Sequence, residues 1–445
     1  MDSTYLNLEA LLKDVGISGS LCMPVIETTV PQKKKRFMLV GTHAHQMTGY
    51  SKVTYHIIQE LAKLGQLELF HFGFQKAQGT PPEYRPYPAG VDVYDAVAAE
   101  ANKTAPAESG FGFSQLPDYV RKVKPDAIMI YNDASIVCRF LEVLTEKLSE
   151  AERAAYKMIV YLDQVYITQR PEFLARIDKD THIYFAFTEY WKTILTEQGI
   201  KKPIHILRHG FDPDQFKPMD RATVRKKHGM PENAFILLNL NRNTPRKRHD
   251  IVVQAFAELV ARHPTKPIAL LCVCDGGELG GFPLREIYVR ELLRLRIPVE
   301  HHLPKLLITT HSMSYTDEIV NELYALSDIG ITAAEGEGFG LCQFEAMGIG
   351  IPQVVPCIGG FRDFCKHGVN SMVAEPKMTL YLPLGSSGIG GAGEYVYPHD
   401  LMLAAEEYLM DSELREKHGV AARETVLSYK WSTEVAELAR VLGGL

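Results

Sequence analysis

The feature that most constrains the fold is a regular alternation of short apolar runs with longer stretches of helical periodicity. In the first half, apolar runs lie at 37–41, 67–74, 126–132, 158–162, 183–187 and 204–207. Between the first two, residues 51–64 place Val53, Ile57 and Leu61 on one helical face. Short continuous apolar runs are typical of parallel strands that helices cover on both sides. The alternation therefore predicts an α/β fold.

The same pattern restarts after a polar segment with two prolines, at 208–221. The new apolar runs lie at 235–240, 268–274, 306–310, 329–332 and 352–356. A single core stops growing at about 250–300 residues, so a chain of 445 residues is expected to form more than one domain. We expect an N-terminal extension (1–32), a first Rossmann-like domain (33–210), a second one (211–425) and a final helical segment (426–445).

Two stretches do not follow the alternation. Residues 75–118 are rich in Pro, Gly and Ala and poorly periodic, which indicates an insertion or long loop. A Gly-rich stretch at 385–393, within 377–397, indicates a surface loop. Whether either one serves a partner is not decided by the sequence.

Charge and composition argue against several classes of protein. The chain has 48 Lys and Arg against 54 Asp and Glu, so nothing general favours nucleic acid or an anionic membrane. The basic run at 33–36 is interpreted as a solvated lead-in to the first strand. No run approaches the about 18 apolar residues of a spanning helix, and the N-terminus does not resemble a secretory signal. With seven scattered cysteines, these features predict a cytoplasmic protein.

The most informative segment is EGEGFGLCQFEAMGIGIPQVV at 335–355, where a Gly-rich loop follows a strand and leads into a short helix. The first N–H groups of a helix are unpaired, and Gly338 and Gly340 allow a ligand close to the backbone, which favours a diphosphate. Glu337 and Glu345 suit hydroxyl groups, for which carboxylates are strong acceptors. The alternative is that both are solvated carboxylates near a helix start.

A cationic turn follows the strand at 235–240, in NRNTPRKRHD (241–250). Fixed cations there would stabilise the negative charge that builds on a leaving diphosphate. We expect Arg246 and Arg248 to be surface residues; the alternative for the whole cluster is a solvated turn.

A third loop, within 41–63, joins the first strand to the helix that begins near Gly49. It lacks the G-x-G-x-x-G fingerprint, which argues against a nicotinamide cofactor. His43 and His45 either touch an acceptor or line the loop, and an H-x-H pair alone is no basis for a metal site.

The motif E-G-F-G-L-x-x-x-E-A-M-x-x-G-x-P, from Glu337 to Pro352, closely resembles the signature of the family-4 retaining glycosyltransferases with the GT-B fold. The resemblance extends over most of residues 36–440. It implies two Rossmann-like domains that face each other across a cleft. It also implies that Glu337 contacts the hydroxyls of the donor sugar and that Glu345 contacts the nucleotide ribose, with Gly338, Phe339, Gly340 and Leu341 in the donor site.

The resemblance also assigns roles outside this motif. It places Arg242 and Lys247 on the donor diphosphate and Gly49 in a loop that reaches the phosphates from the first domain. One departure concerns the end of a first-domain strand, where many members have a His and this chain has Asp163. Asp163 either accepts a hydrogen bond from a substrate hydroxyl in the catalytic site or is an ordinary polar residue at a strand end.

The resemblance thus implies a metal-independent transferase without a cofactor. It would move a sugar, with retention, from a nucleoside diphosphate sugar to a hydroxyl of a glycan or glycolipid. Two alternatives stay open: a nucleotide-sugar epimerase or hydrolase of the same fold, and a non-catalytic scaffold that binds a glycan or protein. The sequence does not define the base, the sugar, the acceptor, the linkage, any peripheral membrane association or the oligomeric state.

Overall fold

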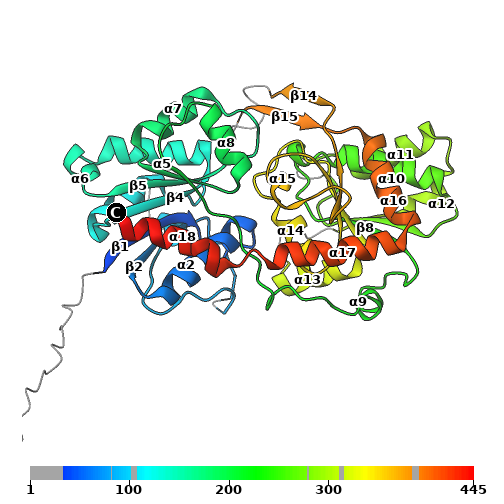
Figure 1. Ribbon diagram of the computed structural model, residues 1–445, viewed down its shortest axis with the longest axis horizontal. Helices are drawn as coiled ribbons and strands as arrows, with labels where there is room; N and C mark the ends of the chain where they lie inside the picture. Colours follow the sequence, from blue (N-terminus) through cyan, green and yellow to red (C-terminus); the bar gives the residue numbers. More distant parts are fainter. Residues whose placement is uncertain (1–33, 82, 102–107, 278–279, 310–314, 383–389) are drawn as a thin grey trace, which may run out of the picture. The chain divides into compact units, whose positions relative to one another are not determined.

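Two parallel sheets flanked by helices make up most of the chain in a computed structural model (Figure 1). The structure describes residues 34–81, 83–101, 108–277, 280–309, 315–382 and 390–445. Of these, Lys35–Leu445 form one compact unit. The expected N-terminal extension at 1–32, and most of the expected Gly-rich loop at 385–393, lie outside the described residues.

The first sheet has seven parallel strands in the order β3-β2-β1-β4-β5-β6-β7. Its strands are β1 (Lys35–Thr42), β2 (Leu67–Phe74), β3 (Asp92–Asp95), β4 (Ala127–Asp133), β5 (Lys157–Asp163), β6 (Ile183–Ala186) and β7 (Ile204–Ile206). The helices of this domain are α2 (Gly49–Leu64), α3 (Ala96–Ala101), α4 (Leu116–Val123), α5 (Ala134–Lys147), α6 (Glu150–Ala154), α7 (Pro171–Asp180) and α8 (Glu189–Glu197), with a 3-10 turn η1 (Phe113–Gln115).

The second sheet has six strands in the order β10-β9-β8-β11-β12-β13. They are β8 (Phe235–Asn239), β9 (Ile268–Cys272), β10 (Leu306–Ile308), β11 (Ile329–Ile331), β12 (Gln353–Pro356) and β13 (Ser371–Ala374), and an antiparallel pair follows, β14 (Met378–Tyr381) and β15 (Ala392–Tyr395). The helices are α9 (Arg221–Lys227), α10 (His249–Arg262), α11 (Leu284–Arg294), α12 (Val299–His302), α13 (Asp317–Leu326), α14 (Leu341–Gly348), α15 (Phe361–Phe364), α16 (Pro398–Met410), α17 (Ser412–Leu427) and α18 (Trp431–Gly444), with 3-10 turns η2 (Pro245–Lys247) and η3 (Leu303–Lys305). In the part of the chain that the structure describes, no helix is both long and apolar enough to cross a membrane.

The strand order reverses at the same point in both sheets, between β1 and β4 and between β8 and β11. In open parallel sheets, ligands bind beside the carboxyl ends of the strands at such a reversal. The structure confirms the predicted α/β class with two parallel sheets, and it directs attention to the loops after β1, β5, β8 and β11.

Strand β8 shows why these apolar runs become buried strands. Phe235 and Leu237 belong to one buried cluster, together with residues of α10 and α16. Ile236 and Leu238, which point to the other face, belong to a second cluster with residues of α13 and α14. Because both faces are covered, a strand in this position needs apolar residues at every step rather than at alternate steps.

The expectation of an insertion or long loop at 75–118 is wrong for part of that segment. It contains β3, which pairs in parallel with β2 at the edge of the first sheet, the helix α3, the turn η1 and the start of α4. Residues 82 and 102–107 lie outside the described residues. The strand is only four residues long and has two aspartates, so its sequence gives almost no apolar period to detect.

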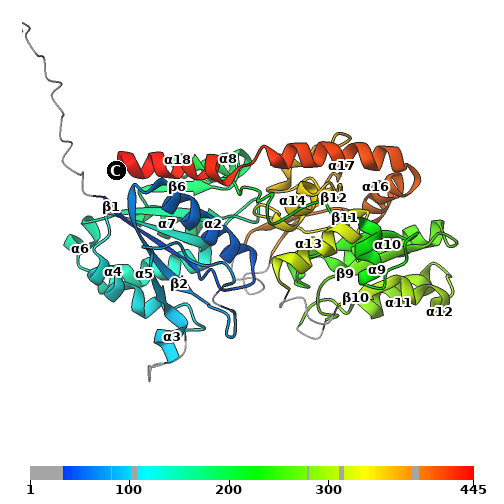
Figure 2. The same cartoon turned by 90° about the horizontal axis from the view of Figure 1, so that it is seen from below.

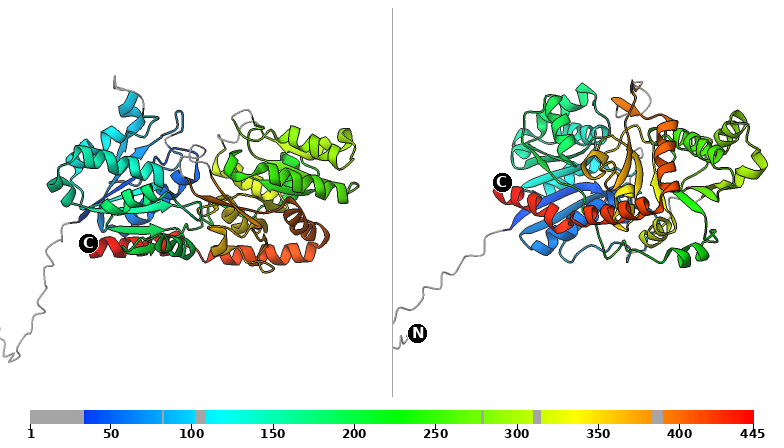
Figure 3. Two further views of the ribbon diagram at one scale, coloured as in Figure 1. Left: turned by 90° about the horizontal axis from the view of Figure 1, so that it is seen from above. Right: turned by 45° about the vertical axis from the view of Figure 1, so that its right-hand side comes forward.

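The last helix packs against the first domain although it follows the second one in sequence. Figure 2 shows α17 and α18 in succession along one side of the two sheets, and Figure 3 shows the same path from other directions. The ring of Trp431 in α18 stacks on His56 of α2, with 4.8 Å between the centroids. At the other end of α18, the ammonium group of Lys35 donates to the carbonyl oxygen of Gly443 at 2.9 Å. The helix is therefore fixed to the first domain at both ends.

Gly210, in the segment between the two sheets, permits this docking. A Cβ at this position would lie 2.4 Å from the backbone nitrogen of Trp431, which is closer than atoms can approach. We therefore expect Gly210→Ala to destabilise the protein by about 1–3 kcal/mol, because the backbone of α18 must shift. Gly443→Ala is the matched control, since a Cβ there meets no atom within 4 Å. Thermal unfolding measures both, and equal melting temperatures for the two variants would refute this account.

Candidate active site

The loop between β11 and α14 contacts the first domain through its backbone. A Cβ at Gly338 would lie 2.0 Å from Oδ1 of Asp163, at the end of β5. Gly340 precedes the first residue of α14 and has φ of 96°, and a Cβ there would lie 2.2 Å from the ring of Phe361. Side chains do not fit at either place, so both glycines are needed for this geometry. The start of α14 therefore faces the first domain with its unpaired N–H groups.

Glu337, in this loop, is a buried carboxylate between two cations. The ammonium group of Lys247 donates a hydrogen bond to Oε2 of Glu337, and Nη1 of Arg246 lies 3.6 Å from the same oxygen. Burial alone would raise the pKa of Glu337, but the positive charges of Lys247 and Arg246 outweigh it and hold the pKa below its ordinary value. Glu337 is therefore ionised and held in a fixed orientation.

The turn η2 explains how these cations reach the loop. It turns the chain immediately before α10 and brings Lys247 to a buried position. Our expectation that Arg246 and Arg248 are surface residues is wrong, because both are half-buried. Arg246 donates to the carbonyl oxygen of Gly336 at 2.6 Å, and the guanidinium of Arg248 lies 4.9 Å from the ring centre of Tyr395. Arg242 is exposed, and its charge also lowers the pKa of Glu337.

Glu345 is buried in α14 and has its cation in the other domain. Lys52, in the first turn of α2, donates to Oε1 of Glu345, and the hydroxyl of Tyr324 donates to Oε2 at 3.1 Å. Each carboxylate oxygen has two lone pairs, so each keeps the capacity to accept one further hydrogen bond. Unlike Glu337, Glu345 depends on contact between the domains for the neutralisation of its charge.

Lys52 also contacts a second buried carboxylate of the second domain. Its ammonium group lies 3.1 Å from Oδ1 of Asp317, the first residue of α13. Arg85, from the first domain, donates to both oxygens of Asp317, at 3.1 and 2.9 Å. Burial opposes ionisation of Asp317, but the two cations lower its pKa to about 2. Two cations of the first domain thus face two carboxylates of the second, and we call these four residues the interdomain charge cluster.

Asp163 lies at the end of β5, where the loop of Gly338 meets the first domain. The hydroxyl of Tyr50, from α2, donates to Oδ2. Oδ1 is buried and accepts no hydrogen bond from any of the residues that the structure describes. Burial raises the pKa of Asp163 to about 6, although Tyr50 and Arg246 oppose the shift. A carboxyl group with such a pKa can exchange a proton near neutral pH.

The other predicted donor residues lie around the same loop. A Cβ at Gly49 would lie 3.4 Å from a methyl carbon of Leu341, so the start of α2 and the start of α14 are in contact. The ring of Phe339 is buried and lies 4.4 Å from the ring of His209, between centroids, so its side chain serves packing.

His43 and His45 lie together at the end of β1. His43 is buried and His45 is half-buried, and their ring centroids are 4.9 Å apart. Burial lowers the pKa of His43 to about 4, so His43 is neutral at physiological pH. Among the described residues, no group of three or more His, Cys, Asp or Glu side chains is placed to hold a metal ion.

Sequence reasoning missed most of the interdomain charge cluster. Lys52, Arg85 and Asp317 come from α2, from the loop before β3 and from the start of α13. Nothing in the local sequence relates these positions, and Arg85 lies in the segment we expected to be an insertion. One signal could have pointed to Lys52: it follows Gly49 by three residues, next to a loop already predicted to face the donor.

Removal of Lys52 tests the interdomain charge cluster. We expect Lys52→Met to lower the free energy of unfolding by about 3 kcal/mol, because Glu345 is left as a buried charge without a cation. The double variant Lys52→Met/Glu345→Gln should recover much of this loss. Lys63→Met is the control, since Lys63 pairs with Glu60 on the exposed end of the same helix. Urea unfolding of the four proteins measures the effects, and a loss no larger for Lys52 than for Lys63 would contradict the cluster's role.

The raised pKa of Asp163 predicts a pH-dependent gain of stability in Asp163→Asn. The folded-state pKa of about 6 lies above the ordinary 3.8, so ionisation of Asp163 reduces stability as the pH rises between these values. Asn is neutral throughout, so the variant should melt higher than the parent at about pH 7 and equally at about pH 4. Asp317→Asn should melt lower than the parent at about pH 7, because the pKa of Asp317 is lowered and its ionised form stabilises the folded state. Melting curves at both pH values check this, and a pH-independent difference for Asp163→Asn would rule it out.

The family match lies within the second domain. Residues 220–380 match the family described as Glycosyl transferases group 1. The chain is 25% identical over 181 residues to D-inositol 3-phosphate glycosyltransferase of Thermobispora bispora, which covers 39% of each protein. It is 27% identical over 187 residues to mannosylfructose-phosphate synthase of Agrobacterium fabrum, over 41% of this chain and 39% of that protein. The chain thus spans about two fifths of the length of these curated relatives.

Solved structures resemble both domains together. HepE of Anabaena, crystallised with UDP and glucose, has a TM-score of 0.68 at 15% identity and covers 92% of this chain and 100% of that one. Sucrose-phosphate synthase of Thermosynechococcus elongatus has a TM-score of 0.67 at 14% identity and covers 92% and 99%. At such identities the likeness shows the fold. The chain therefore has the two-domain GT-B fold, and its residues 220–380 are similar to the group 1 glycosyl transferases.

Proposed function

We propose that this chain is a glycosyltransferase that transfers a sugar from a nucleoside diphosphate sugar to an acceptor hydroxyl. The observation that carries the proposal is Glu337, an ionised carboxylate held between Lys247 and Arg246 beside the N-terminal end of α14. A carboxylate in this place accepts hydrogen bonds from sugar hydroxyls, while the cations and the helix N-terminus attract a diphosphate. A nucleoside diphosphate sugar has sugar hydroxyls next to a diphosphate, so its site needs a carboxylate next to positive charge.

The proposed donor position follows from the remaining hydrogen-bonding capacity. Lys247 has three N–H donors and uses one on Glu337, so two stay available for phosphate oxygens. Glu345 accepts one bond on each oxygen from Lys52 and Tyr324 and can accept two more from the ribose hydroxyls. The ribose can therefore bind without displacing Lys52, and the interdomain charge cluster then holds the domains together over the donor.

In the proposed reaction, the bond between the anomeric carbon and the diphosphate oxygen breaks and the acceptor oxygen bonds to that carbon. The electron pair of the broken bond goes to the diphosphate, where Lys247 and the start of α14 stabilise the charge. The acceptor hydroxyl gives its proton to the leaving phosphate on the same face of the sugar, which retains the configuration. We propose that Asp163, which lies against Gly338, accepts a hydrogen bond from a hydroxyl of either substrate. The residues supply fixed positive charge, so the proposal includes no metal or cofactor.

The names of similar proteins supply the first compounds to test. HepE was solved with UDP-glucose, so UDP-glucose is the first donor. The names D-inositol 3-phosphate glycosyltransferase and mannosylfructose-phosphate synthase suggest which acceptors to test first: small phosphorylated polyols and sugars. Glycans and glycolipids are the wider class of acceptor. We propose a cytoplasmic location.

Replacement of Lys247 tests the mechanism. We expect Lys247→Ala to lower turnover by about 10²–10³-fold with a smaller change in the donor KM, because the charge it stabilises is largest in the transition state. Lys227→Ala, an exposed lysine of α9, is the control. Release of UDP under acceptor saturation measures turnover, and circular dichroism verifies that each variant is folded.

Three results would contradict the proposal in different ways. Turnover of Lys247→Ala equal to that of Lys227→Ala would remove Lys247 from the mechanism. Rapid donor breakdown that no acceptor accelerates would identify a nucleotide-sugar hydrolase or epimerase. Failure of the parent protein to bind UDP, GDP or ADP in calorimetry would favour a non-catalytic scaffold.

A further inference from the structure

Arg242 lies between two buried asparagines in the segment that joins β8 to η2. Asn241 is 4% exposed and Asn243 is 5% exposed, whereas Arg242 is exposed. The guanidinium of Arg242 makes no hydrogen bond or ion pair with any residue that the structure describes, although its charge lowers the pKa of Glu337. The region that this guanidinium can reach is therefore limited by the backbone that carries it.

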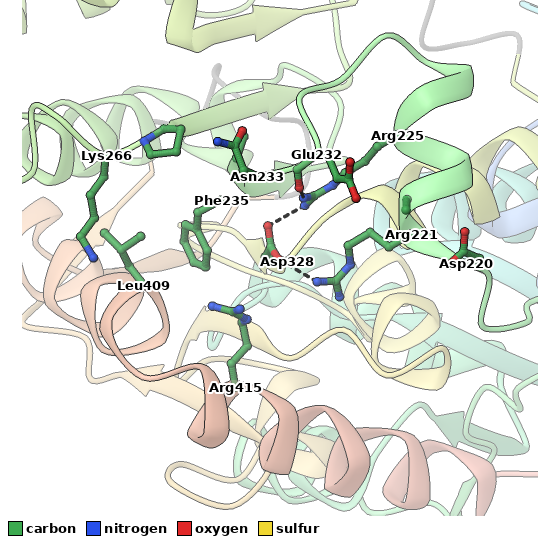
Figure 4. A pocket seen from close by; sticks show the side chains of 13 residues that line it. Asp220, Arg221, Arg225, Glu232, Asn233, Phe235, Lys266, Asp328, Leu409 and Arg415 are labelled. Atoms are coloured by element: carbon green, nitrogen blue, oxygen red, sulfur yellow. Dashed lines mark hydrogen bonds and ion pairs between the residues drawn. The ribbon is translucent and has the colours of Figure 1, made fainter.

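Other cations of this domain are oriented by carboxylates. In the cavity at the amino ends of β8, β9 and β11, Arg221 and Arg225 both donate to Asp328 at 2.7 Å (Figure 4). Lys247, which follows Arg242 in the cationic turn, is likewise oriented by its hydrogen bond to Glu337. Arg242 has no such carboxylate among the described residues, so its position depends on how firmly its two neighbours are held.

Asn243 bonds this backbone to the loop between β9 and α11. Its Nδ2 donates to the carbonyl oxygens of Asp275 at 3.2 Å and of Phe282 at 2.9 Å. The N–H of Phe282 donates to Oδ1 of Asn243 at 2.9 Å. The side-chain amide thus uses both of its N–H groups, and it joins the start of the loop to its end.

The loop also packs closely against Asn243. A Cβ at Gly281 would lie 2.4 Å from Cγ and from the backbone oxygen of Asn243, so only glycine fits there. On the other side of Arg242, Nδ2 of Asn241 donates to Oδ1 of Asn239 at 3.0 Å and to the hydroxyl of Thr332 at 3.1 Å. Both neighbours of Arg242 are therefore fixed, one to the ends of β8 and β11 and the other to the loop.

We propose that Asn243 is a positioning residue, which directs Arg242 toward the donor diphosphate by bonding its backbone to the loop at 275–283. The inference rests on the proposed function, in which a nucleoside diphosphate sugar is the donor. Arg242 is the group that contacts phosphate, and Asn243 acts through it. A cation that is held in place before the ligand arrives loses less conformational freedom on binding, which strengthens the binding.

Calorimetry of the full-length chain tests this role. Of UDP, GDP and ADP, the nucleotide that the parent protein binds most tightly is the probe. We expect Asn243→Ala to weaken its binding about tenfold or more, because a charge-assisted hydrogen bond from Arg242 to phosphate is lost. Gly281→Ala should have the same effect, because its methyl group displaces Asn243 while the amide stays intact. It also serves as the test if Asn243→Ala does not fold.

Gln115→Ala is the control for a general loss of stability. Gln115 is a buried amide of the first domain that donates to the carbonyl oxygen of Ala96 at 3.3 Å. Its replacement should lower the melting temperature and leave the affinity for the nucleotide unchanged.

The variant Arg242→Gln decides whether Asn243 acts through Arg242. In this background Asn243→Ala should weaken the nucleotide hardly at all, because the group that it positions is already gone. The melting temperature should fall equally in both backgrounds, because the hydrogen bonds of Asn243 are lost in both. A merely structural role predicts instead the same loss of affinity in both backgrounds.

The outcomes separate this inference from the proposed function. Losses of affinity that add in the double variant, or parental affinity in both Asn243→Ala and Gly281→Ala, would overturn the inference and leave the proposed function standing. If the parent binds none of the three nucleotides, the inference falls together with the proposed function.

Discussion

The contact between the two domains depends on the mutual neutralisation of buried charges. Glu345 and Asp317 of the second domain would be costly to bury alone, and so would Lys52 and Arg85 of the first. Together they form ion pairs in which each charge has an opposite partner on the other domain. In this arrangement of the two domains, none of these four groups is left buried without an opposite charge.

The two glutamates of the motif are stabilised in different ways, although they are only eight positions apart. Glu337 has both of its cations, Lys247 and Arg246, in its own domain. Glu345 takes its cation from the first domain. Glu337, which we propose holds the sugar, therefore keeps its charge and orientation independently of the contact between the domains. Glu345, which we propose holds the ribose, has its charge neutralised only through that contact. A nucleotide that binds Glu345 would consequently interact with both domains at once.

The features that could be predicted from the sequence are those that depend on residues close together in the chain. Buried runs such as 235–240 have to be apolar on both faces, so the two sheets were predictable from the sequence. The glycines before α14 mark the loop and the start of the helix near Gly340, so this loop was predictable as well. Strand β3 was missed because an edge strand of four residues carries almost no period. Arg246 was misplaced because a basic residue in a turn looks solvated, and only the folded chain brings the carbonyl of Gly336 to it. Arg85 and Asp317 could not be paired, since their relation exists only in three dimensions.

The path of the chain limits how the domains can move. The segment before α9 crosses from the first domain to the second, and the segment between α17 and α18 crosses back. The two crossings are bonded to each other, because the N–H of Phe211 donates to the carbonyl oxygen of Tyr429 at 2.8 Å. Because the two connections are hydrogen-bonded to each other, the chain passes between the domains at one place, and a rotation of one domain relative to the other would pivot there. In such a rotation the docked C-terminal helix, which lies beyond this crossing, would move with the first domain.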